Sequence, residues 1–179
     1  MSNNQKKRFF SAAVRILALM MVVVMLGGCG DKKEKEEEGK KTDPIEAFWT
    51  GMVTADADKV MSAFTKEMQD DALGEMDEEE FEDYLEDTEE ELEMYLGDKL
   101  KVSVEVKDEE KLDEEDLADL REELVEEFDI DGDKVSEAWV IEAEVTVEGS
   151  KDEYSEIYEY VVFQYKGKWY MDPLNSEME

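Results

Sequence analysis

The sequence has no histidine, a single cysteine and few basic side chains. Among its 179 residues, 53 are Asp or Glu and 20 are Lys or Arg, so the formal net charge is −33. Without histidine, the commonest general base near neutral pH is missing. A lone cysteine, Cys29, cannot form a disulfide within the chain. No phosphate-binding glycine loop, nucleophile elbow or zinc-ligand spacing is present.

The segment before Cys29 is too short for a standard membrane span. The apolar run Ile16–Leu26 has 11 residues, whereas a helix needs about 20 to cross a bilayer. Such a run behind a basic segment is typical of a secretory signal peptide. The basic residues are Lys6, Lys7, Arg8 and Arg15, and no acid occurs among the first 28 residues.

The run ends in Leu26-Gly27-Gly28-Cys29, which resembles the lipobox of bacterial lipoproteins. The resemblance implies transfer of a diacylglyceryl group to the Cys29 thiol and cleavage between Gly28 and Cys29, which makes residues 1–28 a lipoprotein signal peptide. Two fatty-acyl chains, of the palmitate type, hold a protein stably on a bilayer. Lipid modification also leaves the mature chain without a thiol for catalysis or metal binding. An ordinary signal peptide and an uncleaved anchor that contains a cysteine are the alternatives.

Residues 29–41 are predicted to be a lipidated cysteine followed by a charged tether. Gly30–Lys41 contains five acids, five bases and no large apolar residue, so it is expected to be disordered. A flexible coil of this length reaches about 20 Å on average. The remaining residues, 42–179, are long enough for one hydrophobic core, and we expect a single domain.

The predicted domain is strongly acidic. Loss of the four basic leader residues changes the net charge from −33 to −37, and the tether is neutral, so the domain carries this charge. Such a surface repels nucleic acid and anionic lipid headgroups and favours cations and basic partners. We therefore expect no nucleic-acid partner. A solvated acidic surface without any specific partner is the plainer interpretation.

The periodicity of apolar residues predicts helices first and strands last. Asp43 is the expected N-cap of the first helix, with Pro44 at its first position and Glu46 closing a capping box. Gly97 is the expected stop of a long acidic helix that begins at Asp77. The helices are expected over 43–53, 60–68, 77–96 and 113–128, and the strands over 100–107, 139–148, 154–165 and 169–171.

This order predicts an α+β domain in which the early helices cover one face of an antiparallel sheet. Lys166-Gly167-Lys168 is the expected turn of the last hairpin. The residues after Pro173 are expected to fray. The predicted core contains Trp49, Phe64, Val102, Val104, Leu120, Ile141, Val145 and Trp169.

Two segments resemble the nuclear transport factor two-like (cystatin-like) superfamily. PIEAFWTGMVTADADKVMSAFT, which begins at Pro44, is similar to its opening helices, and VVFQYKGKWYMD, which ends at Asp172, is similar to its last hairpin. The resemblance implies a cone-shaped, curved sheet wrapped around a helix, with a cavity that is open or filled. Lipid-anchored domains of this kind, many of unknown function, are frequent in Gram-positive bacteria. The resemblance therefore implies a lipid anchor on the extracytoplasmic face of a Gram-positive cell membrane.

Enzymes of that superfamily place carboxylates, tyrosines or histidines inside the cone. Here a carboxylate–tyrosine pair would come from the late strands, which contain Glu142, Glu144, Tyr158, Glu159 and Tyr160. Strand alternation also gives these residues ordinary roles, as half-buried tyrosines and solvent-facing glutamates. We assign no catalytic residue and no cofactor.

The acidic run Asp129–Asp133 resembles a calcium loop at first sight. An EF-hand that begins at Asp129 needs Gly at position 6 and Glu at position 12, where this chain has Lys134 and Val140. A polar turn between helix and strand is the better interpretation, and a weak surface calcium site is the alternative. We assign no metal site.

Three functions remain open from the sequence. The favoured one is a non-catalytic binding module that takes an envelope protein, a peptide or a small ligand at the sheet face or the mouth of the cone. The second is a small isomerase or lyase that acts in the cavity. The third is a structural or cation-binding surface protein. Fold alone does not decide between them.

Overall fold

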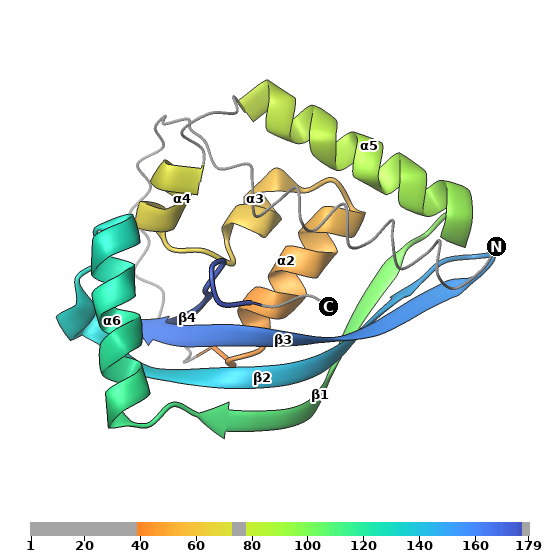
Figure 1. Cartoon of the computed structure of the whole chain (residues 1–179). Helices are drawn as coiled ribbons and strands as arrows, with labels where there is room; N and C mark the ends of the chain where they lie inside the picture. Colours follow the sequence, from red (N-terminus) through yellow and green to blue (C-terminus); the bar gives the residue numbers. More distant parts are fainter. Residues whose placement is uncertain (1–38, 73–77, 177–179) are drawn as a thin grey trace.

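The computed structural model describes residues 39–72 and 78–176 (Figure 1). The predicted leader, residues 1–28, and Cys29 lie outside the described residues. The chain is an α+β protein with an antiparallel sheet, as predicted, and the strands lie in the order β1-β2-β3-β4. The elements are α2 (Asp43–Val53), α3 (Ala57–Met61), α4 (Lys66–Ala72), α5 (Glu78–Leu96), β1 (Lys101–Lys111), α6 (Glu114–Phe128), the 3-10 helix η1 (Gly132–Lys134), β2 (Val135–Glu148), β3 (Glu153–Tyr165) and β4 (Lys168–Met171).

Several element ends follow from local chemistry that the sequence displays. The Asp113 carboxylate accepts hydrogen bonds from the backbone N–H groups of Glu115 at 2.8 Å and Asp116 at 3.1 Å, which caps α6. Gly97 ends α5 with a φ of 90°. Lys166 and Gly167 both have positive φ, 52° and 83°, so the β3–β4 hairpin turns on two residues in left-handed conformation.

Two predicted helix boundaries are wrong. The N-cap position of α2 is Thr42 rather than Asp43, because the Asp43 carboxylate turns back to accept a hydrogen bond from the Lys40 N–H. The predicted helix 60–68 is two helices, α3 and α4. Residues 62–65 separate them, and Thr65 caps α4 by accepting a hydrogen bond from the Met68 N–H at 3.2 Å.

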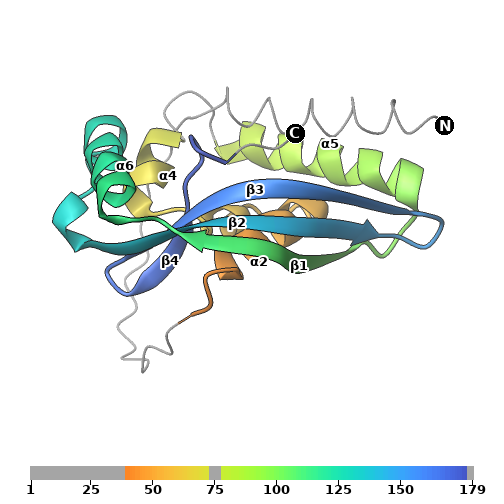
Figure 2. The ribbon, with the colours of Figure 1, turned by 60° about the horizontal axis from the view of Figure 1, so that its bottom comes forward.

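The two faces of the sheet have different partners. Tyr158 and Tyr160 of β3 contact α2: the ring of Tyr158 stacks on Trp49, and Trp49 Nε1 donates a hydrogen bond to the Tyr160 hydroxyl. We call this side the helix face. Because strand side chains alternate, Glu159 and Val161 lie on the opposite side, which we call the outer face. Figure 2 shows α6 at the end of the sheet where β2 begins.

The long helix α5 runs toward the hairpin between β2 and β3 and is bound to it (Figures 1 and 2). The Leu96 carbonyl oxygen accepts hydrogen bonds from the N–H groups of Lys151 at 2.7 Å and Asp152 at 3.1 Å. Gly149 lies so close that a Cβ atom there would be 2.3 Å from the Leu96 oxygen. A residue without a side chain is therefore needed at this contact.

The predicted core is confirmed, and its least buried members lie on edge strands. Trp49, Phe64, Leu120, Ile141 and Val145 are buried. Val102 and Val104 on β1 and Trp169 on β4 are partly buried and pack against this core. These strands are the two edges of the sheet, where a neighbouring strand covers a residue from one side only.

Both ends of the folded part extend further than expected. Lys41, placed in the tether by its sequence, has its Nζ 2.8 Å from Glu109 Oε1 and 3.4 Å from the centroid of the Trp139 ring. At the other end, Asn175 Nδ2 donates hydrogen bonds to Glu123 Oε2 and Asp172 Oδ2, both at 2.8 Å. The segment Pro173–Ser176 is therefore bound to α6 instead of frayed. Residues 177–179 lie outside the described part.

Candidate functional site: an acidic groove on the outer face

The structure separates the carboxylates and tyrosines that the sequence offered as a catalytic pair. Tyr158 and Tyr160 lie on the helix face, whereas Glu142, Glu144 and Glu159 lie on the outer face. Glu144 Oε2 is 2.7 Å from Lys107 Nζ, and this hydrogen-bonded ion pair lowers the pKa of Glu144. These five side chains therefore do not form one site.

The carboxylate nearest to the tyrosines is one that we did not predict, Glu156. The Tyr158 hydroxyl donates to Glu156 Oε2 over 3.4 Å and lies 3.2 Å from the Tyr154 hydroxyl. Burial raises the pKa of both Tyr158 and Tyr160 further above neutral pH than that of a free phenol. Glu156 is two residues from both Tyr154 and Tyr158 on β3, so its side chain points to the same face of the sheet as theirs. This spacing is the sequence signal that would have revealed it. These aromatic rings and Trp49 pack the space between α2 and the sheet.

The run Asp129–Asp133 forms the predicted polar turn between α6 and β2. Asp129 ends α6 in left-handed conformation, and Ile130 is buried. Lys134 Nζ lies 2.7 Å from Asp131 Oδ2, and the hydrogen bond between them lowers the pKa of Asp131. Within residues 39–72 and 78–176, no group of three or more His, Cys, Asp or Glu side chains is arranged to hold a metal ion.

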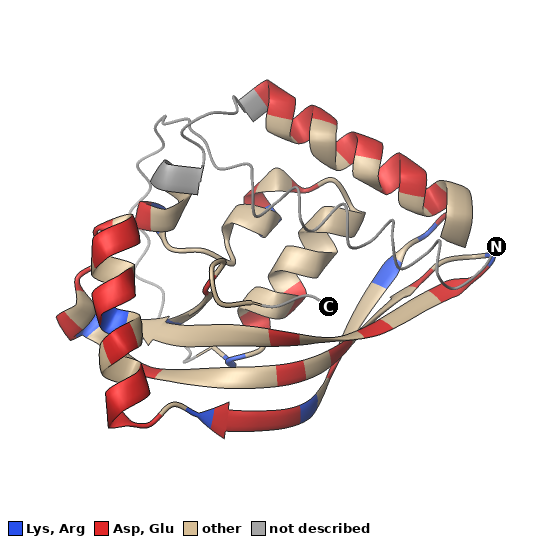
Figure 3. Cartoon of the chain, viewed as in Figure 1, with Lys and Arg blue, Asp and Glu red and all other residues tan. Residues whose placement is uncertain are grey.

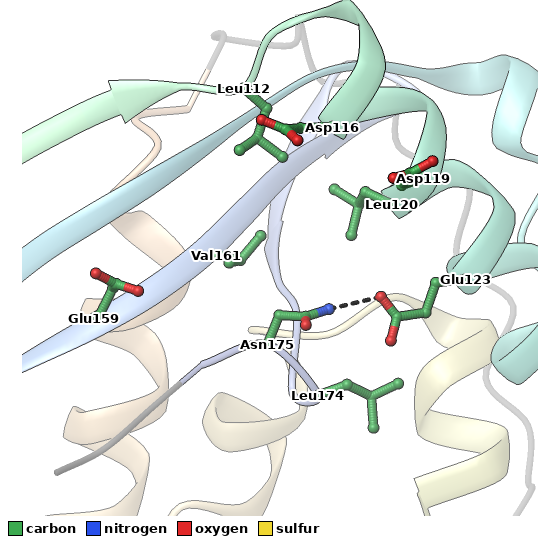
Figure 4. Close-up of a pocket in the computed structure, with 9 residues that line it drawn as sticks. All are labelled: Leu112, Asp116, Asp119, Leu120, Glu123, Glu159, Val161, Leu174 and Asn175. Atoms are coloured by element: carbon green, nitrogen blue, oxygen red, sulfur yellow. Dashed lines mark hydrogen bonds between the residues drawn. The ribbon is translucent and has the colours of Figure 1, made fainter.

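A groove of about 420 Å³ opens on the outer face, between α6, β3 and the segment after β4 (Figure 4). We call it the acidic groove. Its apolar surface is aliphatic, and its polar side chains are four carboxylates and one amide. None of its nine lining residues is basic. They are Leu112, Asp116, Asp119, Leu120, Glu123, Glu159, Val161, Leu174 and Asn175.

Helical and strand periodicity bring these residues together. Asp116, Asp119, Leu120 and Glu123 are three or four residues apart on α6, so they share one side of the helix. Glu159 and Val161 are two residues apart on β3 and share the outer face. Leu120 and Val161 are buried in the floor, whereas 46% of Leu174 is exposed at the rim. Figure 3 shows that acidic residues occur all along α5 and α6, so the groove lies in an acidic region of the protein.

Asp172 holds the C-terminal wall of the groove in place. It is 1% exposed, and its carboxylate accepts hydrogen bonds from the Leu174 N–H at 2.9 Å and Asn175 Nδ2 at 2.8 Å. Burial raises the pKa of Asp172 more than these hydrogen bonds lower it, and the charge of Glu123 raises it further. A buried carboxylate thus positions Leu174 and Asn175 against α6.

This raised pKa predicts an unusual pH dependence. Asp172 holds its proton more tightly in the folded protein than in the unfolded chain, so protonation of Asp172 stabilises the fold. This stabilisation is complete below pH 3.8, the ordinary pKa of an aspartate, and is lost as the pH rises through the raised pKa of the folded protein. Asp172→Asn is neutral at every pH. Its Tm, relative to that of the unchanged protein, is therefore expected to rise from about pH 4 to about pH 7.

The measurement is a series of thermal unfolding curves across that pH range. Asn has one carbonyl oxygen in place of two carboxylate oxygens, so a constant loss of stability is expected in addition to the change in slope. Asp133→Asn, at an exposed position, removes the same charge and serves as the control. Parallel pH profiles for the two variants would show that Asp172 has no raised pKa.

Sequence reasoning missed the acidic groove. Its walls come from α6, β3 and the segment after β4, which are distant in sequence, and no local pattern shows that they meet.

In the described part of the chain, no helix combines the length and apolar character needed to cross a membrane. Comparison with protein-family models, curated proteins and solved structures found no match for this chain.

Proposed function

We propose that this protein is a lipid-anchored, extracytoplasmic binding module that takes its ligand in the acidic groove. The lipobox resemblance at Leu26-Gly27-Gly28-Cys29 supports the anchor, and the neutral tether supports a domain that stands off the membrane. The antiparallel sheet with α2 packed on one face supports the nuclear transport factor two-like interpretation of the fold. On this interpretation the interior of the cone is filled by Trp49, Tyr158 and Tyr160.

The observation that carries the proposal is the composition of the groove. Its volume of about 420 Å³ lies in the range of small-ligand sites, roughly 300–1,000 Å³. Leu112, Leu120, Val161 and Leu174 offer apolar surface for burial, and the carboxylates around them select for positive charge. The groove therefore has both elements of a recognition site, an apolar floor and a few polar groups that fix orientation.

The separation of the carboxylates from the tyrosines favours binding over the isomerase or lyase alternative. General acid–base catalysis needs a carboxylate and a partner within hydrogen-bond reach of one substrate. Glu142, Glu144 and Glu159 lie on the face opposite to Tyr158 and Tyr160. Glu156 does lie beside the Tyr158 hydroxyl, but the Tyr158 ring stacks on Trp49 in the packed core, and neither Tyr158 nor Glu156 lines the acidic groove. Binding without turnover is therefore the function that this geometry supports best.

Ligand retention tests this proposal. The full chain, purified from the cell envelope in a non-ionic detergent, would be incubated with an extract of small envelope molecules, washed and denatured. Mass spectrometry would identify what it releases. We expect the protein to release one class of cationic compound. The amount retained should fall as the salt concentration rises, because exposed charges are screened over about 8 Å at physiological ionic strength.

Two matched double variants make this test specific to the groove. The groove variant, Glu159→Gln with Asp119→Asn, removes two lining charges. The control variant, Glu153→Gln with Glu126→Gln, removes the same charge from exposed positions on the same strand and helix, outside the lining. Retention by the control variant and loss by the groove variant is the expected result. Equal retention by both variants, or conversion of the retained compound to a product, would contradict the proposal.

A further inference from the structure

The acidic groove has carboxylates at two separated ends of an aliphatic floor. Figure 4 shows Glu159, on β3, at one end and Asp119, on α6, at the other, with the side chains of Val161 and Leu120 between them. Asp116 lies beside Leu112, and Glu123 accepts a hydrogen bond from Asn175. The arrangement is therefore one of negative charge, apolar surface and negative charge again along the groove.

A ligand that matches this arrangement has a positive charge at each end and methylene groups between them. Its ammonium groups would pair with Glu159 at one end and with Asp119 at the other. Both carboxylates are exposed, so each ion pair contributes little by itself. Contact of the methylene chain with Leu120 and Val161 adds burial of apolar surface. Affinity therefore depends on both ends and on the length between them.

We infer that the acidic groove binds a short linear aliphatic diamine or polyamine. This inference rests on the proposed function, because it takes the groove as the ligand site. It adds the chemical class of the ligand and assigns Glu159 and Asp119 to opposite ends of it.

Two other cationic occupants fit the groove less well. A calcium ion needs six to eight oxygen ligands at about 2.3–2.6 Å, whereas Val161 and Leu120 lie between Glu159 and Asp119. A basic peptide needs hydrogen-bond donors for its main-chain carbonyls. Of the nine lining side chains, Asn175 alone has N–H groups, and its amide nitrogen donates to Glu123 and Asp172. A diamine needs acceptors only, which the groove supplies.

Isothermal titration of the full chain in non-ionic detergent tests this inference. The probes are α,ω-diamines of increasing length, including 1,4-diaminobutane and 1,5-diaminopentane, with spermidine as the polyamine and n-butylamine as the singly charged control, all at one ionic strength. We expect the best diamine to bind about fivefold tighter than n-butylamine, because it gains one more exposed ion pair and a longer buried chain. Affinity should pass through a maximum with chain length.

The groove variant, Glu159→Gln with Asp119→Asn, is expected to lose about tenfold in diamine affinity, since it removes a charge at each end. The control variant, Glu153→Gln with Glu126→Gln, should lose less than about twofold. Circular dichroism would check that both variants fold, as is expected because all four side chains are exposed.

Four outcomes would overturn the inference. Equal losses in the two variants would show that amines bind to the general acidic surface. Equal affinity for n-butylamine and the diamines would show recognition of one end only. Groove-dependent binding of Mg²⁺ or Ca²⁺ in preference to diamines would identify a divalent-cation site. Groove-dependent binding of a lysine-rich peptide without binding of diamines would identify a peptide site.

The retention experiment separates this inference from the proposed function. If the groove variant loses a retained envelope compound but diamines bind neither protein, the groove is a ligand site for another class of molecule. If both experiments show no dependence on the groove, the proposed function itself is wrong.

Discussion

Replacing Trp49 with alanine is expected to lower the free energy of unfolding by about 3–5 kcal/mol. Trp49 is 2% exposed and lies between α2 and the sheet, where it stacks on Tyr158 with ring centroids 5.4 Å apart. Its Nε1 also donates a hydrogen bond to the buried Tyr160 hydroxyl. The truncation thus creates a cavity and removes the donor from a buried acceptor, and both changes destabilise the folded state. Urea denaturation followed by circular dichroism measures the loss.

Trp169→Ala is the matched control for this prediction. Trp169 is half-buried on the edge strand β4, so the same change in side-chain volume should cost much less. Trp49→Phe keeps an aromatic ring but removes the indole N–H, and its effect should be intermediate. If Trp49→Ala and Trp169→Ala were equally destabilising, α2 would not be packed on the sheet through Trp49.

Replacing Cys29 with serine is expected to abolish lipid attachment and processing of the precursor. The reason is chemical: the lipobox resemblance makes the Cys29 thiol the acceptor of the diacylglyceryl group, and Cys29 is the one cysteine of the chain. Labelling with a radioactive fatty acid and fractionation of the membrane measure the outcome. The unchanged protein should take up label and start at Cys29, whereas Cys29→Ser should remain an unlabelled precursor.

Gly30→Ser is a suitable control, because it changes a neighbouring small residue and keeps the thiol. Uptake of label by Cys29→Ser would refute the lipobox interpretation. Recovery of the unchanged protein wholly in the medium, without label, would also refute it. The groove and its ligand would be unaffected by that result, since they depend on the folded domain alone.

The fold could be predicted from the sequence where local chemistry decides the backbone. Asp113 caps α6, Gly97 ends α5 and Lys166-Gly167 forms the last hairpin because capping and positive φ are properties of a few adjacent residues. Alternation along β2 and β3 correctly assigned Ile141 and Val145 to the core. It could not show that β1 and β4 are edge strands, because strand order is a property of the whole sheet. The smaller burial of Val102, Val104 and Trp169 therefore could not be predicted from alternation.

The acidic groove could not be predicted, because it exists through contacts between distant segments. Asp116 and Asp119 look like part of the solvated side of an acidic helix when α6 is considered alone. Leu174 and Asn175 look like the frayed end of a polar tail. Their position depends on the buried carboxylate of Asp172 and on the hydrogen bond between Asn175 and Glu123, which are 52 residues apart. The sequence contains the residues of the site but not the packing that brings them together.

The contacts of Lys41 have a mechanical consequence for a protein held at its N-terminal side. Lys41 is bound to Glu109 on β1 and lies over Trp139 on β2. Lys40, the residue before it, is hydrogen-bonded to Asp43 at the start of α2. A pulling force applied to the chain before Gly39 is therefore divided between the first turn of α2, through Lys40, and strands β1 and β2, through Lys41. The hydrogen bonds that pair β1 with β2 extend from Lys101 to Lys111, so α2 does not carry this force alone.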